Sequence, residues 1–312
     1  MSDTKELRNL RTKEQLVLGF VLLIVCIALV GCPPQKNQAT PVPVSVQKMD
    51  VVVNSITDAT GISFTLPITS QRIISLAPAI TENIKILNAQ DRIVGRTDFC
   101  TGISATSIGN LLEPSIEKMV ELKPDLVLAT KDGNRPQIVE KLRSLGITVF
   151  VFGETNSWED IENNFRLFGK LLGKIRLSEE ILNPIQNELV HYESMYKVFI
   201  QLNVTPLMTA GQNTFIDEII DYAGGYNIAA DSILPWPTLN VEEIIQRNPD
   251  VIIISDMGQI TEQAKQMWQQ ERFSVVSAVK NKRIYVMDSD SLCQPTPINF
   301  IKAVRQMREW LK

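Results

Sequence analysis

Histidine and cysteine, which most metal sites and nucleophilic active sites require, are scarce in this sequence. The 312 residues include one histidine, His191, and four cysteines. A single imidazole is too few for the usual zinc and first-row transition metal sites, and it leaves no Ser/His/Asp set. A glycine-rich phosphate loop and a nucleophile elbow are also missing. We therefore expect neither an enzyme nor a protein that binds a bare ferric ion.

An excess of positive charge is also lacking. Lys and Arg total 31 against 35 Asp and Glu, and the sequence pI is about 5.3. This balance gives no reason to expect nucleic acid as a partner. A hydrophobic content of 44% and a charged content of 21% are typical of a globular protein. The length is enough for two domains.

The longest apolar run is too short to span a membrane comfortably. It covers 15 residues, 16–30, against the roughly 20 that a transmembrane helix needs. Basic residues precede it, namely Lys5, Arg8, Arg11 and Lys13. We predict that residues 1–31 are a secretory signal, with an uncleaved anchor as the alternative. The small residues before Cys32 resemble a lipobox, which implies cleavage there and a lipid on Cys32. In both cases the body of the protein lies outside the cytoplasm, tethered to a membrane.

Residues 32–50 are polar and rich in proline, as expected of a flexible tether. Without residues 1–31 the chain carries 27 basic and 32 acidic side chains, a net charge of −5. Its cysteines are then Cys32, Cys100 and Cys293. If Cys32 is acylated, one Cys100–Cys293 disulfide or two free thiols are compatible with the sequence.

A repeated unit indicates two similar lobes. Residues 117–130 read as a short amphipathic helix, a Pro-Asp break and an apolar strand, and residues 242–255 repeat the pattern. Strands and helices alternate around both copies, which predicts an α/β fold with mostly parallel sheets flanked by helices. We assign residues 51–175 to an N-terminal lobe and 201–312 to a C-terminal lobe.

A single long helix is expected to join the lobes. Apolar residues step by three or four from Leu177 to Phe199, which predicts an interlobe helix over 176–200. Such a helix would be about 34 Å long. Pro184 should either kink it or mark its true start. His191 would then lie mid-helix, in a solvated or packing role.

Ligand-binding residues are expected where the parallel strands end, because ligands gather outside the carboxyl ends of such sheets. Two such edges facing each other would form a cleft between the lobes. The candidates are Pro78, Phe99, Asn134, Trp236 and Asp288. Trp236 stands between two prolines as a rigid apolar plate; the alternative is a lid over the core of its own lobe.

Glu117 and Glu242 occupy equivalent positions in the two repeat units, each seven residues before the proline. A carboxylate in the first turn of a helix stabilises it by about 0.3–1 kcal/mol through the helix dipole, and this alone could explain each residue. Two carboxylates at one offset, one per lobe, would also suit docking onto a two-fold partner with basic sockets.

Several segments together resemble the substrate-binding proteins of ABC importers for cobalamin and iron chelates. They are Arg72-Ile73-Ile74-Ser75-Leu76-Ala77-Pro78, Asp91-Arg92-Ile93-Val94-Gly95, Leu122-Lys123-Pro124-Asp125-Leu126-Val127, Ala223-Gly224-Gly225-Tyr226-Asn227 and Ala278-Val279-Lys280-Asn281-Lys282-Arg283-Ile284-Tyr285. The resemblance covers nearly the whole mature chain. It implies two α/β lobes joined by one rigid helix, a ligand cleft between them and a small hinge motion.

Within that family the chain is most similar to the cobalamin-binding branch. The similarity rests on Leu234-Pro235-Trp236-Pro237 followed by Glu242, on Asp132-Gly133-Asn134 and on Val198-Phe199-Ile200-Gln201. It implies that Trp236 contacts the corrin. It also implies that Glu117 and Glu242 meet arginines of the two permease subunits. The partners would be an ABC permease dimer with its ATPase subunits.

Other ligands and roles remain open. Positions that tend to be aromatic in the cobalamin branch are Leu111 and Thr130 here, and Phe99 retains one ring. An iron(III) siderophore or haem is therefore the alternative ligand. The alternative of another class is a membrane-tethered sensor without a transport role. We expect a monomer without a resident cofactor, on the outer face of the cytoplasmic membrane or in the periplasm.

Overall fold

The computed structural model describes residues 54–66, 68, 70–193, 196–256 and 258–312, and every structural statement below concerns these residues. The predicted leader, the tether and Cys32 lie outside them. Within the described ranges, no helix is both long enough and apolar enough to cross a membrane.

The N-terminal lobe is a parallel α/β sheet preceded by an antiparallel hairpin of β1 (Ser55–Thr57) and β2 (Ser63–Thr65). Five described strands form the sheet in the order β5-β4-β3-β6-β7, with every pair parallel. They are β3 (Ile73–Ser75), β4 (Ile93–Arg96), β5 (Thr106–Ser107), β6 (Leu126–Thr130) and β7 (Val149–Phe152). Strands β3 and β7 and nearly all of β6 are buried, because helices cover both faces of the sheet.

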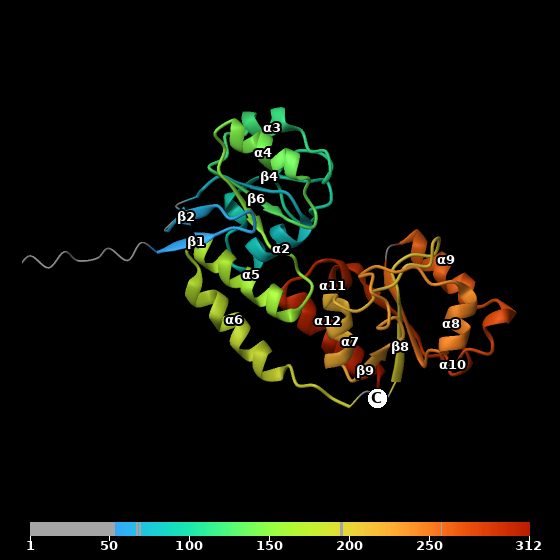
Figure 1. The fold of residues 1–312 in the computed structure, drawn as a ribbon. Coiled ribbons are helices and arrows are strands. Elements are labelled where there is room, and N and C mark those ends of the chain that lie inside the picture. The colour runs from blue at the N-terminus through green and yellow to red at the C-terminus, as the bar shows by residue number, and fades with distance from the viewer. Residues whose placement is uncertain (1–53, 67, 69, 194–195, 257) are drawn as a thin grey trace, which may run out of the picture. The chain divides into compact units, whose positions relative to one another are not determined.

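Helices of the N-terminal lobe pack in two layers around this sheet (Figure 1). Ile80 of α2 (Pro78–Ile86) and Phe165 of α5 (Trp158–Leu171) share one core with Phe150. Met119 of α3 (Ile116–Glu121) and Leu142 of α4 (Pro136–Ser144) share a second core with Val127. A 3-10 turn, η1 (Gln90–Arg92), leads into β4. Ala77 is extended and Pro78 lies in the first turn of α2, where a missing N–H costs nothing.

The helix predicted over 176–200 is shorter than expected. Helix α6 covers Ile175–Glu188 with Pro184 inside it, and residues 196–201 form strand β8 (Tyr196–Gln201) instead. The prediction failed because Tyr196 and Phe199 continue the three-and-four spacing by coincidence. Residues 198–201 are in fact buried as part of a central strand. Because both faces of such a strand are covered, its sequence lacks the alternation that would have distinguished it from a helix. His191 follows α6; its Nδ1 lies 2.6 Å from the Asp221 carboxylate.

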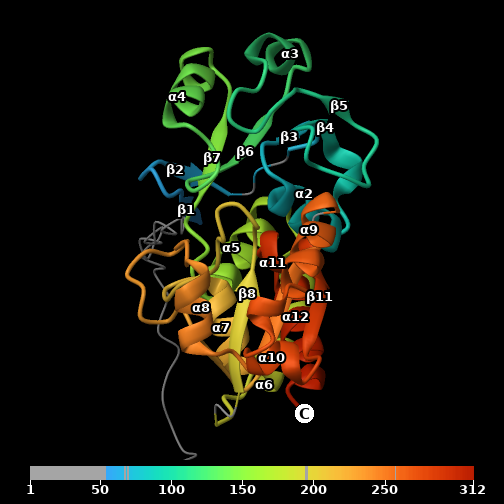
Figure 2. The same cartoon turned by 90° about the vertical axis from the view of Figure 1, so that its right-hand side faces the viewer.

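The C-terminal lobe repeats the architecture (Figure 2). Four described strands lie in the order β11-β10-β8-β9, all parallel. The remaining strands are β9 (Gly225–Asn227), β10 (Val251–Asp256) and β11 (Ile284–Asp288). The helical elements are α7 (Phe215–Tyr222), α8 (Val241–Arg247), α9 (Gln259–Trp268), η2 (Glu271–Phe273), α10 (Ser277–Lys280), α11 (Ser289–Cys293) and α12 (Pro297–Trp310).

One hydrophobic core runs through both lobes. It includes Phe150 and Phe165 of the N-terminal lobe together with Ile200, Phe215 and Phe300 of the C-terminal lobe. At the crossing point the Trp158 ring lies 5.1 Å from the Phe300 ring. The Trp158 backbone N–H donates to the Glu218 carboxylate at 2.5 Å, and burial raises the pKa of Glu218. The lobes are thus joined by packed side chains as well as by α6.

Candidate functional site

A cavity of about 600 Å³ lies where the carboxyl ends of β6 and β7 meet loops of the C-terminal lobe. This volume is within the range of roughly 300–1,000 Å³ typical of small-molecule sites. Its lining comprises Ala77, Pro78, Ala79, Ile80, Asn83, Leu111, Thr130, Asp132, Gly133, Phe152, Gly153, Glu154, Thr155, Asn156, Asn164, Phe168, Gln212, Asn213, Phe215, Ile233, Pro235, Trp236, Cys293 and Pro295. The predicted cleft between the lobes is therefore present.

Asn134 shapes the N-terminal wall of the cavity without lining it. Its side chain is buried; Oδ1 accepts from the Thr130 N–H at 2.9 Å, and Nδ2 donates to the Leu76 carbonyl at 3.1 Å. These bonds tie the loop after β6 to the loop that opens α2. The Gly133 N–H donates to Thr130 Oγ1 at 3.1 Å, which closes the same turn.

Part of the C-terminal wall is a loop, residues 228–240, that carries Ile233, Pro235 and Trp236; we name it the Trp236 loop. It lies against the segment that follows β8. The Gly211 N–H donates to the Pro235 carbonyl at 2.9 Å, and the Thr209 N–H donates to the Pro237 carbonyl at 3.0 Å. A Cβ on Gly211 would overlap the Leu234 carbonyl oxygen. Two prolines and these bonds hold Trp236 in place, 45% exposed at the cavity.

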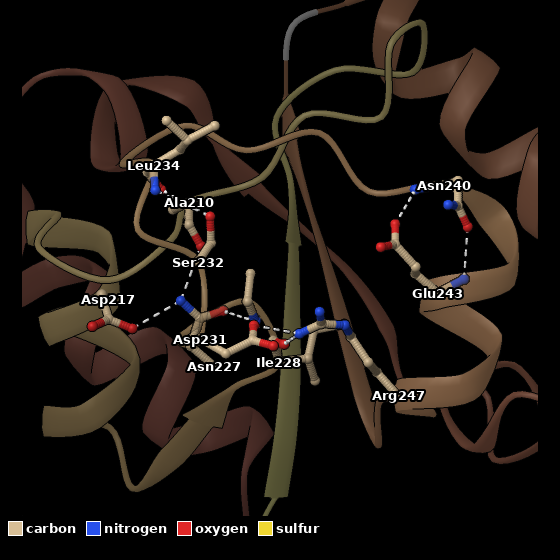
Figure 3. Close-up of polar contacts among 11 residues, drawn as sticks. Ala210, Asp217, Asn227, Ile228, Asp231, Ser232, Leu234, Asn240, Glu243 and Arg247 are labelled. Atoms are coloured by element: carbon tan, nitrogen blue, oxygen red, sulfur yellow. Dashed lines mark hydrogen bonds and ion pairs between the residues drawn. The ribbon is translucent and has the colours of Figure 1, made fainter.

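Both ends of the Trp236 loop are fixed to helix α8 (Figure 3). At one end Arg247 donates to the Ile228 carbonyl and to the Asp231 carboxylate. The bond between Arg247 and Asp231 lowers the pKa of Asp231. At the other end Asn240 and Glu243 form a capping box with two bonds of 2.8 Å.

A buried amide supports the base of the same loop. Asn227 Nδ2 donates to the Ala210 carbonyl at 2.9 Å and to the Asp217 carboxylate at 2.8 Å (Figure 3). Burial raises the pKa of Asp217. Asn227 Oδ1 accepts from the Ala229 N–H at 3.0 Å, so the loop leaves β9 in one fixed direction.

Charge in the described cavity lining is entirely negative, carried by Asp132 and Glu154. Neither lysine nor arginine is among the described lining residues. Groups of His, Cys, Asp and Glu able to hold a metal ion are absent from the described residues. The described lining therefore combines two carboxylates, neutral hydroxyl and amide groups, and apolar surface.

Of the five predicted ligand-binding residues, Pro78 and Trp236 line the cavity. Phe99 is 60% exposed and lies outside the lining. Asp288 also lies outside it; the residue caps α11 and pairs with Lys302 at 2.8 Å. Although partial burial acts to raise it, the pKa of Asp288 is held below its ordinary value by Lys302 and Ser291. Asn134 is buried in a supporting role.

Sequence reasoning missed several lining residues. Asp132 and Glu154 follow β6 and β7, so the strand-end rule places them at the right edge without singling them out. Asn83 and Phe168 lie on the inner faces of α2 and α5. No signal in the sequence separates these two from ordinary core positions.

The repeat units place Glu117 and Glu242 in the first turns of α3 and α8, and both are exposed. The Ser115 hydroxyl donates to the Glu117 carboxylate at 3.2 Å and also caps α3. Leu111 and Trp236, which both line the cavity, each stand six residues before one of these glutamates. Each lobe therefore runs directly from a cavity residue into a helix that carries an exposed carboxylate.

The two units also match where they meet their sheets. Lys123 and Asn248, each just before the proline, have φ angles of 47° and 48°. Asp125 then accepts from the Arg72 N–H at 3.1 Å, and Asp250 accepts from the Lys197 N–H at 3.0 Å. In both lobes the aspartate thus fixes the start of the neighbouring parallel strand.

Cys100 and Cys293 are both free. Cys100 is buried, and its Sγ lies 3.2 Å from Thr97 Oγ1. Cys293 is exposed and contributes to the cavity lining. The free-thiol alternative is the one present in this structure.

Comparison with known proteins agrees with this architecture. Residues 73–291 match the family model described as periplasmic binding protein. A vitamin B12-binding protein of Vibrio cholerae is 29% identical over 256 residues, 79% of this chain and 91% of that protein. A protein of Bacillus subtilis named an uncharacterized ABC transporter substrate-binding lipoprotein is 26% identical over 95% of this chain and 97% of its own length.

Comparison with solved structures also points to periplasmic binding proteins. The crystal structure of the periplasmic vitamin B12 binding protein of Vibrio cholerae superposes with a TM-score of 0.66 at 28% identity, covering 78% of this chain and 98% of that chain. These relatives are named as binding proteins and not as enzymes. The two-lobed α/β fold, the cleft and the family model together show that this chain belongs to the periplasmic binding protein family.

Proposed function

We propose that this chain is the extracytoplasmic solute-binding protein of an ABC importer, and that it captures cobalamin or a related corrinoid. The relatives named as vitamin B12-binding proteins and as an ABC transporter substrate-binding lipoprotein support this assignment. The lobe structure and the cleft are suited to a ligand that is held between two walls and then handed on.

The observation that carries the choice of ligand is the character of the cavity lining. Trp236 and Phe168 offer apolar faces for a flat macrocycle, and Gln212, Asn156 and Asn164 offer amides around it. The charged groups among the described lining residues are acidic. A corrin carries neutral amides on its edge, whereas haem carries two carboxylates that would find no basic partner among the described lining residues. A corrinoid therefore fits this lining better than haem does.

An iron(III) siderophore is the second candidate ligand. Leu111 and Thr130 line the N-terminal wall, where a stacking aromatic would be expected for a corrin. A lining with fewer rings also accommodates a globular chelate. The family resemblance covers both ligand types.

Isothermal titration of the purified chain with cyanocobalamin and with a panel of ferric siderophores tests this proposal. We expect saturable one-to-one binding of cyanocobalamin. Binding of a siderophore without any binding of cyanocobalamin would replace the first candidate with the second.

The transport role implies a partner and a location. We propose that Glu117 and Glu242 dock the monomeric chain onto arginines of a two-subunit permease, which works with separate ATPase subunits. A lipid on Cys32 would hold the chain at the outer face of the cytoplasmic membrane or in the periplasm. Co-purification with the permease would support this role. Ligand binding without permease contact would favour the alternative of a membrane-tethered sensor.

A further inference from the structure

Each wall of the cavity is assembled from segments that lie far apart in the chain. The N-terminal wall includes the start of α2, Leu111 and the loop after β6. The C-terminal wall includes lining residues between 212 and 215 and the Trp236 loop. A buried asparagine in each lobe, Asn134 and Asn227, hydrogen-bonds to such segments. We name these two residues the bracing asparagines.

Asn134 connects three parts of the N-terminal wall. Besides its bonds to Thr130 and Leu76, its Nδ2 donates to the Leu111 carbonyl at 3.5 Å. Thr130 and Leu111 line the cavity themselves, and Leu76 is followed directly by the lining residue Ala77. The amide of Asn134 therefore sets the spacing of these three parts.

Asn227 has the corresponding role in the C-terminal lobe (Figure 3). The Ala210 carbonyl, to which it donates, stands two residues before Gln212 of the lining. Its other donor bond goes to Asp217 in the first turn of α7, and its oxygen accepts from Ala229 near the start of the Trp236 loop. Both amide hydrogens and the oxygen of Asn227 thus join segments of this wall.

The bracing asparagines act on the cavity without facing it. They are 7% and 3% exposed, and neither belongs to the described cavity lining. A planar amide that donates in two directions and accepts in a third fixes the relative positions of three segments at once. Without it, buried carbonyl and N–H groups would lose their partners, and the segments would have to move to find others.

We propose that Asn134 and Asn227 are positioning residues that hold the two walls of the cavity in the binding-competent shape before the ligand arrives. This inference rests on the proposed solute-binding function but not on the ligand being a corrinoid. A cavity that is competent for only part of the time has an apparent affinity lowered in proportion to that fraction. The bracing asparagines thus set the affinity and the association rate, although neither contacts the ligand.

Hydrogen exchange of the ligand-free chain tests the bracing by itself. Leucine has a similar size to asparagine and makes no side-chain hydrogen bonds. In Asn227→Leu, amide exchange in residues 209–216 and 228–240 should become about tenfold faster than in the wild type. In Asn134→Leu the same change should appear in residues 130–134.

Gln201→Leu is the matched control for both variants. Gln201 is also a buried amide, but its Oε1 accepts from Trp268 Nε1 at 2.7 Å, and neither residue is in the described cavity lining. This change should lower stability in urea and leave exchange in the wall segments at the wild-type rate. Exchange in the bracing variants as slow as in this control would overturn the inference.

Stopped-flow binding measures the consequence for the ligand, with cyanocobalamin and ferrioxamine B as the probes. Each bracing variant should bind about tenfold more weakly, through a slower association rate, while the dissociation rate stays within about twofold of the wild type. Trp236→Ala, a change in the lining itself, should instead raise the dissociation rate. Gln201→Leu should bind like the wild type. Unchanged affinity in both bracing variants, or a loss confined to the dissociation rate, would overturn the inference.

A milder pair of variants covers the case in which Asn227→Leu does not fold. Asp217→Ala removes one of the partners of Asn227, whereas Asp217→Asn keeps an acceptor oxygen there. The first should slow association about threefold, and the second should restore the wild-type rate. Equal association rates for these two variants would overturn the role of Asn227.

The exchange and binding measurements separate this inference from the proposed function. If neither cyanocobalamin nor any ferric siderophore binds, the solute-binding proposal fails, and faster exchange in the bracing variants would still support the positioning role. If cyanocobalamin binds and the variants change neither exchange nor association, the proposed function stands and the positioning role fails.

Discussion

At the residue scale, Asp58 accepts several hydrogen bonds at a site that is not part of the cavity lining. Its carboxylate accepts from the Thr60 N–H at 2.8 Å, from the Ile62 N–H at 3.0 Å and from Arg143 at 2.5 Å. The Val151 N–H also donates to it, at 3.2 Å. One buried carboxylate therefore connects the β1–β2 hairpin to β7 and α4.

Replacing Asp58 by Ala should lower the free energy of unfolding by about 3 kcal/mol. The reason is that Arg143 and several backbone N–H groups would be left without their buried acceptor. Urea unfolding followed by circular dichroism would measure the change. Lys141→Ala, an exposed change on the same helix, should stay within about 0.5 kcal/mol of the wild type. A loss as small as that of the control would contradict this role for Asp58.

The same carboxylate predicts a pH dependence. Burial alone would raise the pKa of Asp58, but bonds from Thr60, Ile62 and Val151 hold it below the ordinary value of 3.8. The folded state thus binds the proton less readily than the unfolded state, so this stabilisation is complete above the ordinary pKa and is lost as the pH falls through the lowered one. Asp58→Ala should therefore lose less stability than the wild type on acidification below about pH 4.

Gly211 is a residue at which one methyl group should disturb the site. A Cβ there would overlap the Leu234 carbonyl oxygen and press on Pro237. Gly211→Ala should displace the Trp236 loop, lower the free energy of unfolding by about 1–3 kcal/mol and weaken cyanocobalamin binding by about tenfold. Unfolding and titration measure the two effects.

The matched change is Gly153→Ala, where the nearest atom to a Cβ would be Asn164 Oδ1 at an ordinary 3.8 Å. Its stability should remain close to that of the wild type. Equal stability for both variants would show that the Trp236 loop tolerates displacement.

The sequence predicts a cavity residue well when local chemistry fixes its position. Pro78 opens a helix at a strand end, and Trp236 is fixed by two neighbouring prolines. Asp288 ends β11 and Phe99 lies shortly after β4, but neither side chain lines the cavity. Asp288 caps α11 and pairs with Lys302, whereas Phe99 is 60% exposed. Such outcomes depend on contacts far apart in the chain.

At the element scale, the repeated helix-strand unit is the feature that the sequence predicts most fully. Both copies form the expected short helix and strand, α3 with β6 and α8 with β10. The matching φ angles and the aspartate bonds to the neighbouring strand could not be foreseen, because they depend on strand order. The interlobe helix was predicted to be too long, because over a few residues the apolar spacing of a helix cannot be distinguished from the apolar run of a fully buried strand.

Helices α3 and α8 carry the docking proposal. Glu117→Ala/Glu242→Ala should leave cyanocobalamin binding within about twofold of the wild type, because neither residue lines the cavity. Affinity for the detergent-solubilised permease should fall by about a hundredfold, at about tenfold for each lost charge pair. Surface plasmon resonance against the immobilised permease complex would measure this.

The control for docking is Glu180→Ala on α6, an exposed carboxylate that pairs with Arg176 at 3.3 Å within its own helix. It should bind the permease like the wild type. If the double variant docked as well as this control, Glu117 and Glu242 would have no more than their helix-dipole role.

At the scale of the whole molecule, the continuous core limits how the lobes can move. Phe300 and Ile301 of α12 belong to the same buried cluster as Phe165 of α5, and the Trp158–Glu218 bond crosses the lobe boundary. Opening the cleft widely would expose these side chains, at roughly 25 cal/mol for each Å² of apolar surface. This cost opposes a wide opening, and the small hinge motion implied by the family resemblance stays a prediction.

The proposed location of this binding protein depends on the proposed lipid on Cys32, which can be tested directly. Cys32→Ser should abolish the incorporation of labelled palmitate and move the chain from the membrane fraction to the soluble extracytoplasmic fraction. Only a sulfur at this position can form the thioether that holds the lipid. Cys26→Ser is the matched control: it lies in the apolar run that cleavage would remove, so lipid and membrane association should persist. Intact-mass spectrometry of the wild type should show residues 1–31 missing. Membrane retention of Cys32→Ser with residues 1–31 still present would establish the uncleaved anchor instead.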